Sequence, residues 1–540
     1  MLITRRTALS GAAGATLLAS AHPASAQTAS PTRAETLRYV TGGNVNTLDP
    51  TTPGATRESF GLSMNVYDRL FSFGRKPVGD NWSFDAKTIR GELAQGYQAS
   101  PDGLSLKVTL RPDATWHDGS PVTAEDIKWS LDRAVSAKSL APPQLSTGSL
   151  TDAGQFRILD PHSIEVVLPK PDRLAAANLC IPYAIMVNSK LARQHAPEGD
   201  PWAQEWLKAN TAAGGAYAVE TYRPGESATL RRNEAWKGSA GGALPAFRRI
   251  IVQTVPEPAT RANLIERGDA DLAIDLAASD IPTMERAAKV KVVSVPQNNG
   301  FTHITVNTQA KPFDDVRVRQ AIAAALPYED MFKAALFGRG AKLYGAGWTG
   351  MPPDSSFPQP IPNRTDPARA KQLLADAGLA GGFTTPFAIS AGQAATAEPV
   401  AALVKESLGR IGVTVDIQKK PDSEFNTLEA EKKLPFYLDG ATAWLPATDY
   451  YFRLYFTRDQ RWNFANWKNT EIERLSSDAR FETDAAKYDT DCREMIQVFT
   501  DQVPLIMLWQ PNHDAVMAAT VDGYTYQFYR QADFRDLKRV

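Results

Sequence analysis

Residues Leu104 to Arg133 read LSLKVTLRPDATWHDGSPVTAEDIKWSLDR, a run in which three local structures follow one another. Apolar and polar residues alternate from Leu104 to Leu110, which predicts a strand with one buried face. The D-G-S-P letters of Asp118 to Pro121 predict a turn. Thr123 has a side chain suited to a helix N-cap, and two acidic residues follow it, so we expect a helix from Ala124.

The same run resembles the signature of a known family. From Leu110 to Arg133 it matches L-R-P-x-x-x-W-H-D-G-x-P-x-T-A-E-D-I-x-W-S-L-x-R, which is similar to a segment of the dipeptide and oligopeptide family of extracytoplasmic solute-binding proteins. The letters P-F-D-D-V-R-V-R-Q-A-I-A-A-A-L from Pro312 to Leu326 are a second specific match. The resemblance implies a binding protein, in which Leu104 to Arg133 build the scaffold rather than touch the ligand.

The resemblance also implies the fold. Members have the α/β, two-lobe periplasmic-binding-protein fold (type II, cluster C-like), with an extra subdomain in the first lobe and a two-segment hinge. By this resemblance the first lobe takes residues 27–60, 186–296 and 506–540, the extra subdomain 61–185, and the second lobe 297–505. Chain crossings near Val295 to Asn298 and near Gln502 to Leu505 would form a hinge that lets the lobes close.

The N-terminus predicts export. Met1 to Ala26 contains Arg5-Arg6, a weakly apolar stretch and a final A-S-A, which is typical of a cleaved export signal at 1–26. The paired arginines resemble a twin-arginine signal, whereas Ala8, at a position usually held by a large apolar residue, keeps the ordinary secretory route open. No stretch of about 20 apolar residues follows, so we expect a soluble periplasmic protein, and we expect it to be a monomer.

Composition and motifs narrow the function classes. The chain has 59 Lys and Arg against 60 Asp and Glu, so no charge excess favours nucleic acid. G-x-S-x-G, H-E-x-x-H and C-x-x-C are absent, and the histidines lack metal-ligand spacing, so we expect no enzyme, no cofactor and no metal. His303, near the expected hinge, is the histidine to test for metal first. Cys180 and Cys492 either pair or lie buried as small hydrophobic residues.

The strongest ligand-site candidate is the segment AWLPATDYYFRLYF from Ala443 to Phe456, which resembles the family's G-W-x-x-D-x-x-x-P segment. The resemblance implies that Trp444 lines the cleft and that an aspartate three residues later binds the ligand's amine. Ala447 stands at that position, so a buried ammonium would lack its partner. Either Asp449 takes over the ionic role or the ligand has no amine, and Asp449 as a helix N-cap is the competing interpretation.

Four more residues complete the predicted site. Tyr450 and Tyr451 lie beside Trp444 in the sequence, where they either stack on the ligand or pack in the core. Asn44 and Asn46, on the loop after the first expected strand, either donate hydrogen bonds from the other lobe or form a turn.

The sequence therefore predicts a periplasmic solute-binding component of an ABC import system. It would capture a small solute, namely a peptide, an opine-like conjugate or a short oligosaccharide, and deliver it to an inner-membrane permease. The alternatives are an exported hydrolase on the same scaffold and a nickel- or haem-carrying binding protein.

Overall fold

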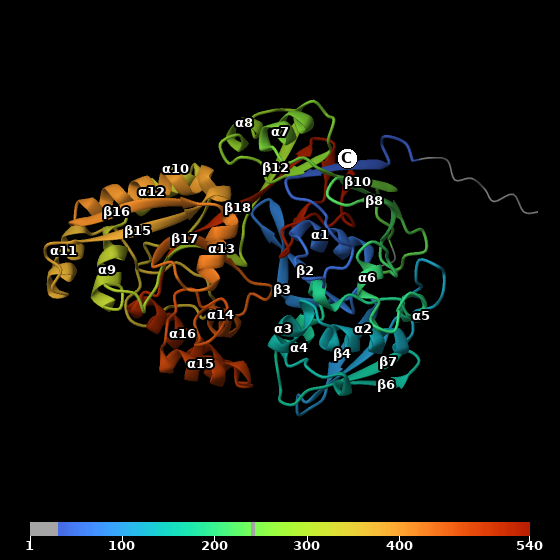
Figure 1. Cartoon of the computed structure of the whole chain (residues 1–540). Coiled ribbons are helices and arrows are strands. Elements are labelled where there is room, and N and C mark those ends of the chain that lie inside the picture. The colour runs from blue at the N-terminus through green and yellow to red at the C-terminus, as the bar shows by residue number, and fades with distance from the viewer. Residues whose placement is uncertain (1–30, 239–242) are drawn as a thin grey trace, which may run out of the picture.

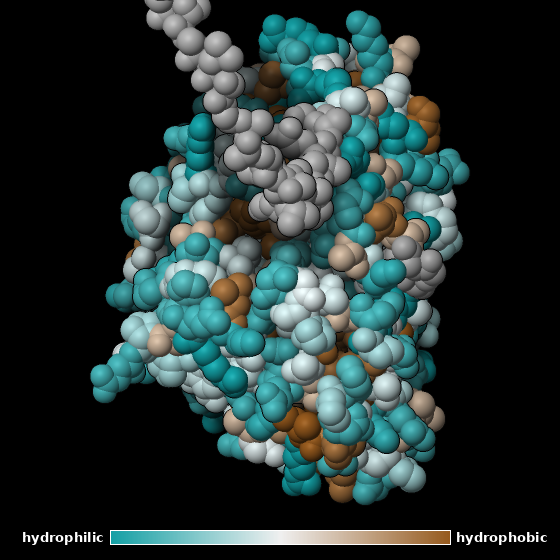
Figure 2. Space-filling model, turned by 90° about the vertical axis from the view of Figure 1, so that its right-hand side faces the viewer, coloured by the Kyte–Doolittle hydropathy of each residue, from teal (hydrophilic) through white to brown (hydrophobic). Residues whose placement is uncertain are grey.

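The computed structural model describes residues 31–238 and 243–540, so the export signal predicted for residues 1–26 lies outside the described residues. Figure 1 shows two lobes side by side, joined by the long strand β18 (Leu505–Ala518). We call the half around β1 (Thr36–Thr41) the first lobe and the half around β13 (Gly300–Val306) the second lobe. The outer face of the first lobe is mostly hydrophilic, with small separate apolar areas (Figure 2).

The first lobe is built on one half of a 12-stranded mixed sheet. At its centre β1 is parallel to both of its neighbours, β10 (Arg249–Thr254) and β11 (Leu272–Ile274). Beyond β10, the antiparallel strands β9 (Ser227–Arg232) and β8 (Tyr217–Arg223) extend the edge. Its helices are α1 (Arg57–Val66), α5 (Ser189–Gln194), α6 (Gln204–Leu207), α7 (Pro258–Glu266) and α8 (Ile281–Met284). Loops at the carboxyl ends of such parallel strands are where α/β proteins bind ligands.

Two small sheets are attached to the first lobe. Their strands are β2 (Phe71–Val78), β3 (Asn81–Gly91) and β20 (Thr525–Tyr526) in one, and β4 (Ala94–Ala99), β5 (Ser105–Leu110), β7 (Ser163–Val167) and β6 (Phe156–Asp160) in the other. The helices beside them are α2 (Ala124–Ser136), α3 (Ala141–Leu145), α4 (Ala175–Asn178), η1 (Ser146–Gly148), η2 (Ala153–Gln155) and η3 (Pro182–Ala184).

The strand and helix predicted from Leu104 to Arg133 are confirmed as β5 and α2. Helix α2 begins at Ala124 because the Thr123 side chain accepts from the Asp126 backbone and the Asp126 side chain accepts from the Thr123 backbone. Near the other end of α2, Arg133 forms a buried ion pair with Asp49, which anchors the loop that follows β1.

The second lobe has a sheet in the order β16-β15-β17-β13-β18. The further strands are β14 (Gly340–Lys342), β15 (Phe383–Ser390), β16 (Val413–Lys420) and β17 (Phe436–Thr442). Its helices are α9 (Val316–Ala325), α10 (Tyr328–Leu336), α11 (Pro367–Asp376), η4 (Ala391–Gln393), α12 (Ala394–Gly409), α13 (Asp422–Ala430), α14 (Thr448–Tyr455), α15 (Thr470–Arg480) and α16 (Ala485–Gln502). In Figure 1, α13 and α14 lie on the side that faces the first lobe.

Two antiparallel segments connect the lobes. Strand β12 (Val290–Pro296) continues into β13 through residues 297–299. Strand β18 pairs with β13 up to Trp509 and with β12 from Asn512 onward, so it changes lobe between these residues. This point comes later than the 502–505 crossing expected from the sequence, because an apolar strand pattern does not show where a strand changes partner. The short strands β19 (Val521–Asp522) and β21 (Lys538–Arg539) follow.

Candidate functional site

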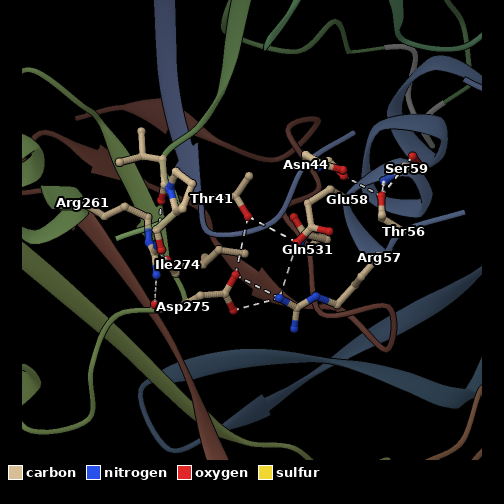
Figure 3. A network of polar contacts seen from close by, with 12 residues as sticks. Thr41, Asn44, Thr56, Arg57, Glu58, Ser59, Arg261, Ile274, Asp275 and Gln531 are labelled. Carbon is tan, nitrogen blue, oxygen red and sulfur yellow. Dashed lines mark hydrogen bonds and ion pairs between the residues drawn. The ribbon is translucent and has the colours of Figure 1, made fainter. Parts of the chain in front are cut away.

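A charged network lies at the carboxyl ends of β1 and β11 (Figure 3). Arg57, the first residue of α1, donates through Nη2 to both carboxylate oxygens of Asp275 at 2.9 Å. The same nitrogen lies 3.5 Å from Glu58 Oε1, and Thr41 Oγ1 at the end of β1 lies 3.5 Å from both carboxylates. The network therefore joins two strand ends and one helix start.

Neighbouring groups keep this network charged. Burial alone would raise the pKa of Asp275, but the surrounding positive charges, that of Arg57 first, and the hydrogen bonds from Arg57 together outweigh burial and hold the pKa below its ordinary value. The loop after β1 presses closely on the network, because a Cβ added at Gly43 would come within 2.4 Å of the Glu58 carboxylate. Only glycine fits there without displacing an acidic partner.

Asn44 and Asn46 lie on this loop and are exposed. Asn46 accepts from Thr56 N at 3.1 Å and from Ser59 Oγ at 3.0 Å, and it donates to Gly54 O at 2.9 Å. Its amide thus braces the start of α1. Within residues 31–238 and 243–540 no hydrogen bond of the Asn44 side chain is found, while its carbonyl accepts from Thr56 Oγ1 at 2.6 Å. Ligand binding by either asparagine stays a prediction.

Trp444, just after β17, reaches from the second lobe into the first. Its half-buried ring makes T-shaped contacts with Phe60 at 5.2 Å, Tyr183 at 5.4 Å and Phe528 at 6.1 Å between ring centroids. These rings belong to α1, η3 and the C-terminal segment. Trp444 is therefore the second lobe's side of an aromatic junction between the lobes.

Asp449 lies in the first turn of α14, whose N-cap is Ala447, so the N-cap interpretation of Asp449 is wrong. The side chain is fully buried. Its Oδ1 accepts from Tyr488 Oη at 2.8 Å, and its Oδ2 lies 3.5 Å from Arg453 Nε. Its charge is already paired inside the second lobe, and the binding of a ligand cation by Asp449 stays a prediction.

Tyr450 and Tyr451 are buried, as the core-packing interpretation expects. The Tyr451 ring packs at 5.5 Å from Phe357 and 6.1 Å from Phe301. Its hydroxyl has no hydrogen-bond partner in the described part of the chain, and burial raises its pKa well above the ordinary value. Contact of these two side chains with a ligand also stays a prediction.

A cavity of about 550 Å³ opens between the lobes. The first lobe lines one wall with Phe73, Lys76 and residues 84–87. The second lobe lines the other wall with Ser355 to Pro358, Leu445 to Thr448 and Tyr488. Asn298 and Gln510, which lie at the two crossings, close the cavity. The volume lies in the range of about 300–1,000 Å³ that is usual for small-molecule sites. Ala447 lies on the wall itself, and Asp449 reaches the cavity only through its hydrogen bond to Tyr488.

Polar contacts hold the lobes together around this cavity. The buried Asn299, at the first crossing, donates to Ala443 O at 2.8 Å and to Phe528 O at 2.9 Å. Farther out, Arg453 Nη2 donates to Thr147 O at 3.2 Å, and Arg480 Nη2 donates to Ser146 O at 2.8 Å. The structure therefore shows the two lobes in contact on both sides of the aromatic junction.

Comparison with known proteins identifies the family. A family model described as bacterial extracellular solute-binding proteins, family 5, middle, matches residues 88–463. The chain belongs to this family. It is 24% identical over 486 residues to the probable D,D-dipeptide-binding periplasmic protein DdpA of Escherichia coli, covering 89% of each chain. It is 26% identical over 378 residues to the glutathione-binding protein GsiB of Salmonella typhimurium, covering 70% of this chain and 68% of that protein.

A solved structure shows the same fold. The periplasmic binding protein AgaA of A. tumefaciens, in complex with agropinic acid, aligns with a TM-score of 0.74 at 20% identity, covering 94% of this chain and 99% of that one. The two-lobe α/β fold and the role as the solute-binding component of an ABC importer are confirmed, and the hydrolase and metal-carrier alternatives are not favoured. Among the described residues, no helix is both long and apolar enough to cross a membrane.

Two histidines, His303 and His513, and both cysteines of this family 5 protein are buried. Burial lowers the pKa of both His303 and His513 to about 3, so both rings are neutral at neutral pH. In the described ranges no three His, Cys, Asp or Glu side chains gather as metal ligands would. Cys180 and Cys492 are free and buried, which confirms the small-hydrophobe interpretation.

A buried carboxyl pair in the second lobe escaped the sequence analysis. Glu429 of α13 and Asp439 of β17 are in hydrogen-bonding contact. Burial and the neighbouring Asp439 raise the pKa of Glu429 to about 10. Burial and the neighbouring carboxyl thus favour the protonated form of Glu429 at neutral pH.

Three charged residues of the first lobe also escaped prediction: Arg57, Asp275 and Arg530. Asp275 directly follows the buried strand β11, so its place at a strand's carboxyl end was a usable signal. Arg530 ends the aromatic run Y-T-Y-Q-F-Y-R, and no sequence pattern shows that this run returns to the lobe interface.

Proposed function

We propose that this family 5 protein, exported to the periplasm and freed of its signal peptide, acts as a monomer that captures a peptide-like or opine-like solute. The solute is held between the lobes and handed to an inner-membrane ABC permease. The observation that carries the proposal is the closed arrangement in which Trp444 packs against three first-lobe rings beside a cavity of about 550 Å³. A ligand that contacts both walls would favour this state over an open one.

The cavity wall argues against recognition of a free amine at position 447. The segment of Leu445 to Thr448 presents a methyl group there, and the nearby carboxylate of Asp449 is committed to Tyr488 and Arg453. Bringing an ammonium to this point without a partner would be costly. The solute therefore either lacks an amine here or has it neutralised by a bond, as in a conjugate.

The test starts with protein purified from its own periplasm. The protein is denatured, the released small molecules are identified by mass spectrometry, and each is titrated back by calorimetry. We expect a single solute that binds without being consumed. Chemical turnover of the solute, or the absence of any rebinding molecule, would contradict the proposal.

Trp444 supplies a matched optical test. Its fluorescence should change when the rebinding solute is added to wild type, and the change should be lost in Trp444→Phe. Trp82, which is 39% exposed on β3, provides the control, and Trp82→Phe should keep the full signal. A signal that survives in Trp444→Phe would place the solute elsewhere.

Two variants distinguish between two possible roles of Asp449, orienting Tyr488 and binding a cation of the solute. If Asp449 only orients Tyr488, Asp449→Asn and Tyr488→Phe should weaken solute binding equally. If Asp449 binds a cation of the solute, Asp449→Asn should cost about 2–5 kcal/mol more than Tyr488→Phe. Unchanged affinity in both variants would remove Asp449 from the site.

A further inference from the structure

Arg530 is a half-buried cation that lacks an ionic partner. In residues 31–238 and 243–540 its guanidinium takes part in no hydrogen bond and no ion pair. Its neighbour Arg57 is paired with Asp275 through Nη2. Burial and the like charge of Arg57 lower the pKa of Arg530. A half-buried arginine without an ionic partner has lost part of its hydration, and no anion offsets that cost.

The surrounding structure holds the Arg530 backbone in place. Its φ of 56° is in the left-handed region, which a residue with a side chain adopts at a cost of about 1–3 kcal/mol. On one side Gln531 donates to Glu58 at 3.2 Å, and on the other the carbonyl of Phe528 accepts from Asn299 at 2.9 Å. Such strain persists where the neighbours fix the chain, and it is common at ligand sites.

Arg530 lies where the two lobes meet. From the first lobe the charges of Arg57, Asp275 and Glu58 act on it. From the second lobe it is close enough to Tyr455 of α14 to affect that hydroxyl, which donates to Thr442 O at 2.9 Å. Two residues earlier, Phe528 touches the Trp444 ring, so Arg530 flanks the aromatic junction.

We propose that Arg530 binds a carboxylate of the captured solute. This inference rests on the proposed function and narrows it to solutes with a free carboxylate. The five N–H donors of an arginine lie in a planar fork that matches the two oxygens of a carboxylate. The carboxylate would supply the missing anion, and the charge of Asp275 stays with Arg57.

A stability measurement tests the proposal without any solute. Arg530→Met removes an unpaired cation, so the urea midpoint of the empty protein should stay the same or rise. The control is Arg535→Met, because Arg535 is ion-paired with Asp533 at 2.6 Å and Glu92 at 3.4 Å, and its loss should lower the midpoint. A midpoint for Arg530→Met as low as that of Arg535→Met would show a structural arginine and overturn the proposal.

A binding measurement then tests the carboxylate. Two pools of N-acetylated dipeptides with the same side chains, one with free C-terminal carboxylates and one with C-terminal amides, are offered to the protein. Retained members are identified by native mass spectrometry. Wild type should retain members of the acid pool only. In Arg530→Met the retained amount should fall at least about 10-fold, and in Arg530→Lys it should fall less. Equal retention of both pools, or full retention by Arg530→Met, would overturn the proposal.

The two measurements distinguish this proposal from the proposed function. If wild type retains neither pool, the result counts against a peptide-like solute. The role of Arg530 is then decided by the urea midpoints alone, since these compare empty proteins.

Discussion

Removal of the Trp444 ring tests whether the aromatic junction stabilises the closed arrangement of the lobes. The ring makes three edge contacts with first-lobe rings, at 5.2, 5.4 and 6.1 Å. Each such pair contributes about 0.5–1.5 kcal/mol beyond the area that it buries. Because all three cross between the lobes, Trp444→Ala should weaken the closed state relative to an open one by about 2–4 kcal/mol, or roughly 30-fold to 700-fold in population.

Small-angle X-ray scattering of the empty protein measures this shift directly. We expect a larger radius of gyration for Trp444→Ala than for wild type, and no change for Trp82→Ala, which removes an indole from β3 outside the junction. Urea unfolding of both variants checks that the lobes remain folded. A radius of gyration for Trp444→Ala equal to that of wild type would show that the backbone crossings and arginine contacts alone set the lobe arrangement.

Three further predictions concern the charged groups. Glu429→Gln should stabilise the protein by about 1–3 kcal/mol at pH 8, measured by urea unfolding. Between pH 4.5 and about 10 the wild-type Glu429 is protonated in the folded state and ionised in the unfolded state, so the wild-type protein loses stability as the pH rises through this window. Equal pH profiles of stability for wild type and variant would refute this. Asp275→Asn should lower the free energy of unfolding by about 1–2 kcal/mol in the same assay, because Arg57 loses its carboxylate partner but stays partly solvated. An unchanged urea midpoint would show that water compensates for the lost carboxylate. Gly43→Ala should lower the free energy of unfolding by about 1–3 kcal/mol, because its Cβ would lie only 2.4 Å from the Glu58 carboxyl carbon. An unchanged free energy of unfolding would show that the loop moves freely.

Local signals predicted the fold well. The β5 alternation and the Thr123 cap are determined by neighbouring residues, and both were read correctly from Leu104 to Arg133. The length and partners of β18 were not predicted, because pairing with β11 to β14 depends on residues more than 160 positions away along the chain, a separation visible in the strand register. Periodicity reports which face is buried, but it does not report which strand lies alongside.

The residues of the candidate site also differ in whether local sequence could predict their roles. Trp444 was found because it belongs to a recognisable segment, and the structure places it between the lobes. Asp449 was read as a cap or a ligand group, whereas its partner Tyr488 lies 39 positions later. Arg530 was missed because its significance lies in having no partner among the described residues, a property of the assembled structure.

The pairing of β18 also affects how the chain reaches its folded state. Strands β11, β12, β13 and β14 all pair with this single strand, which begins at Leu505 of a 540-residue chain. During synthesis from the N-terminus, neither half of the large sheet can be completed until the residues of β18, from Leu505 on, have been made. A chain truncated before Leu505 would leave β11 and β13 without the strand that lies between them, so both lobes should be open to aggregation at unpaired strand edges. Strand β18, which joins the lobes in the folded protein, is thus also the strand whose pairing completes the sheets of both lobes.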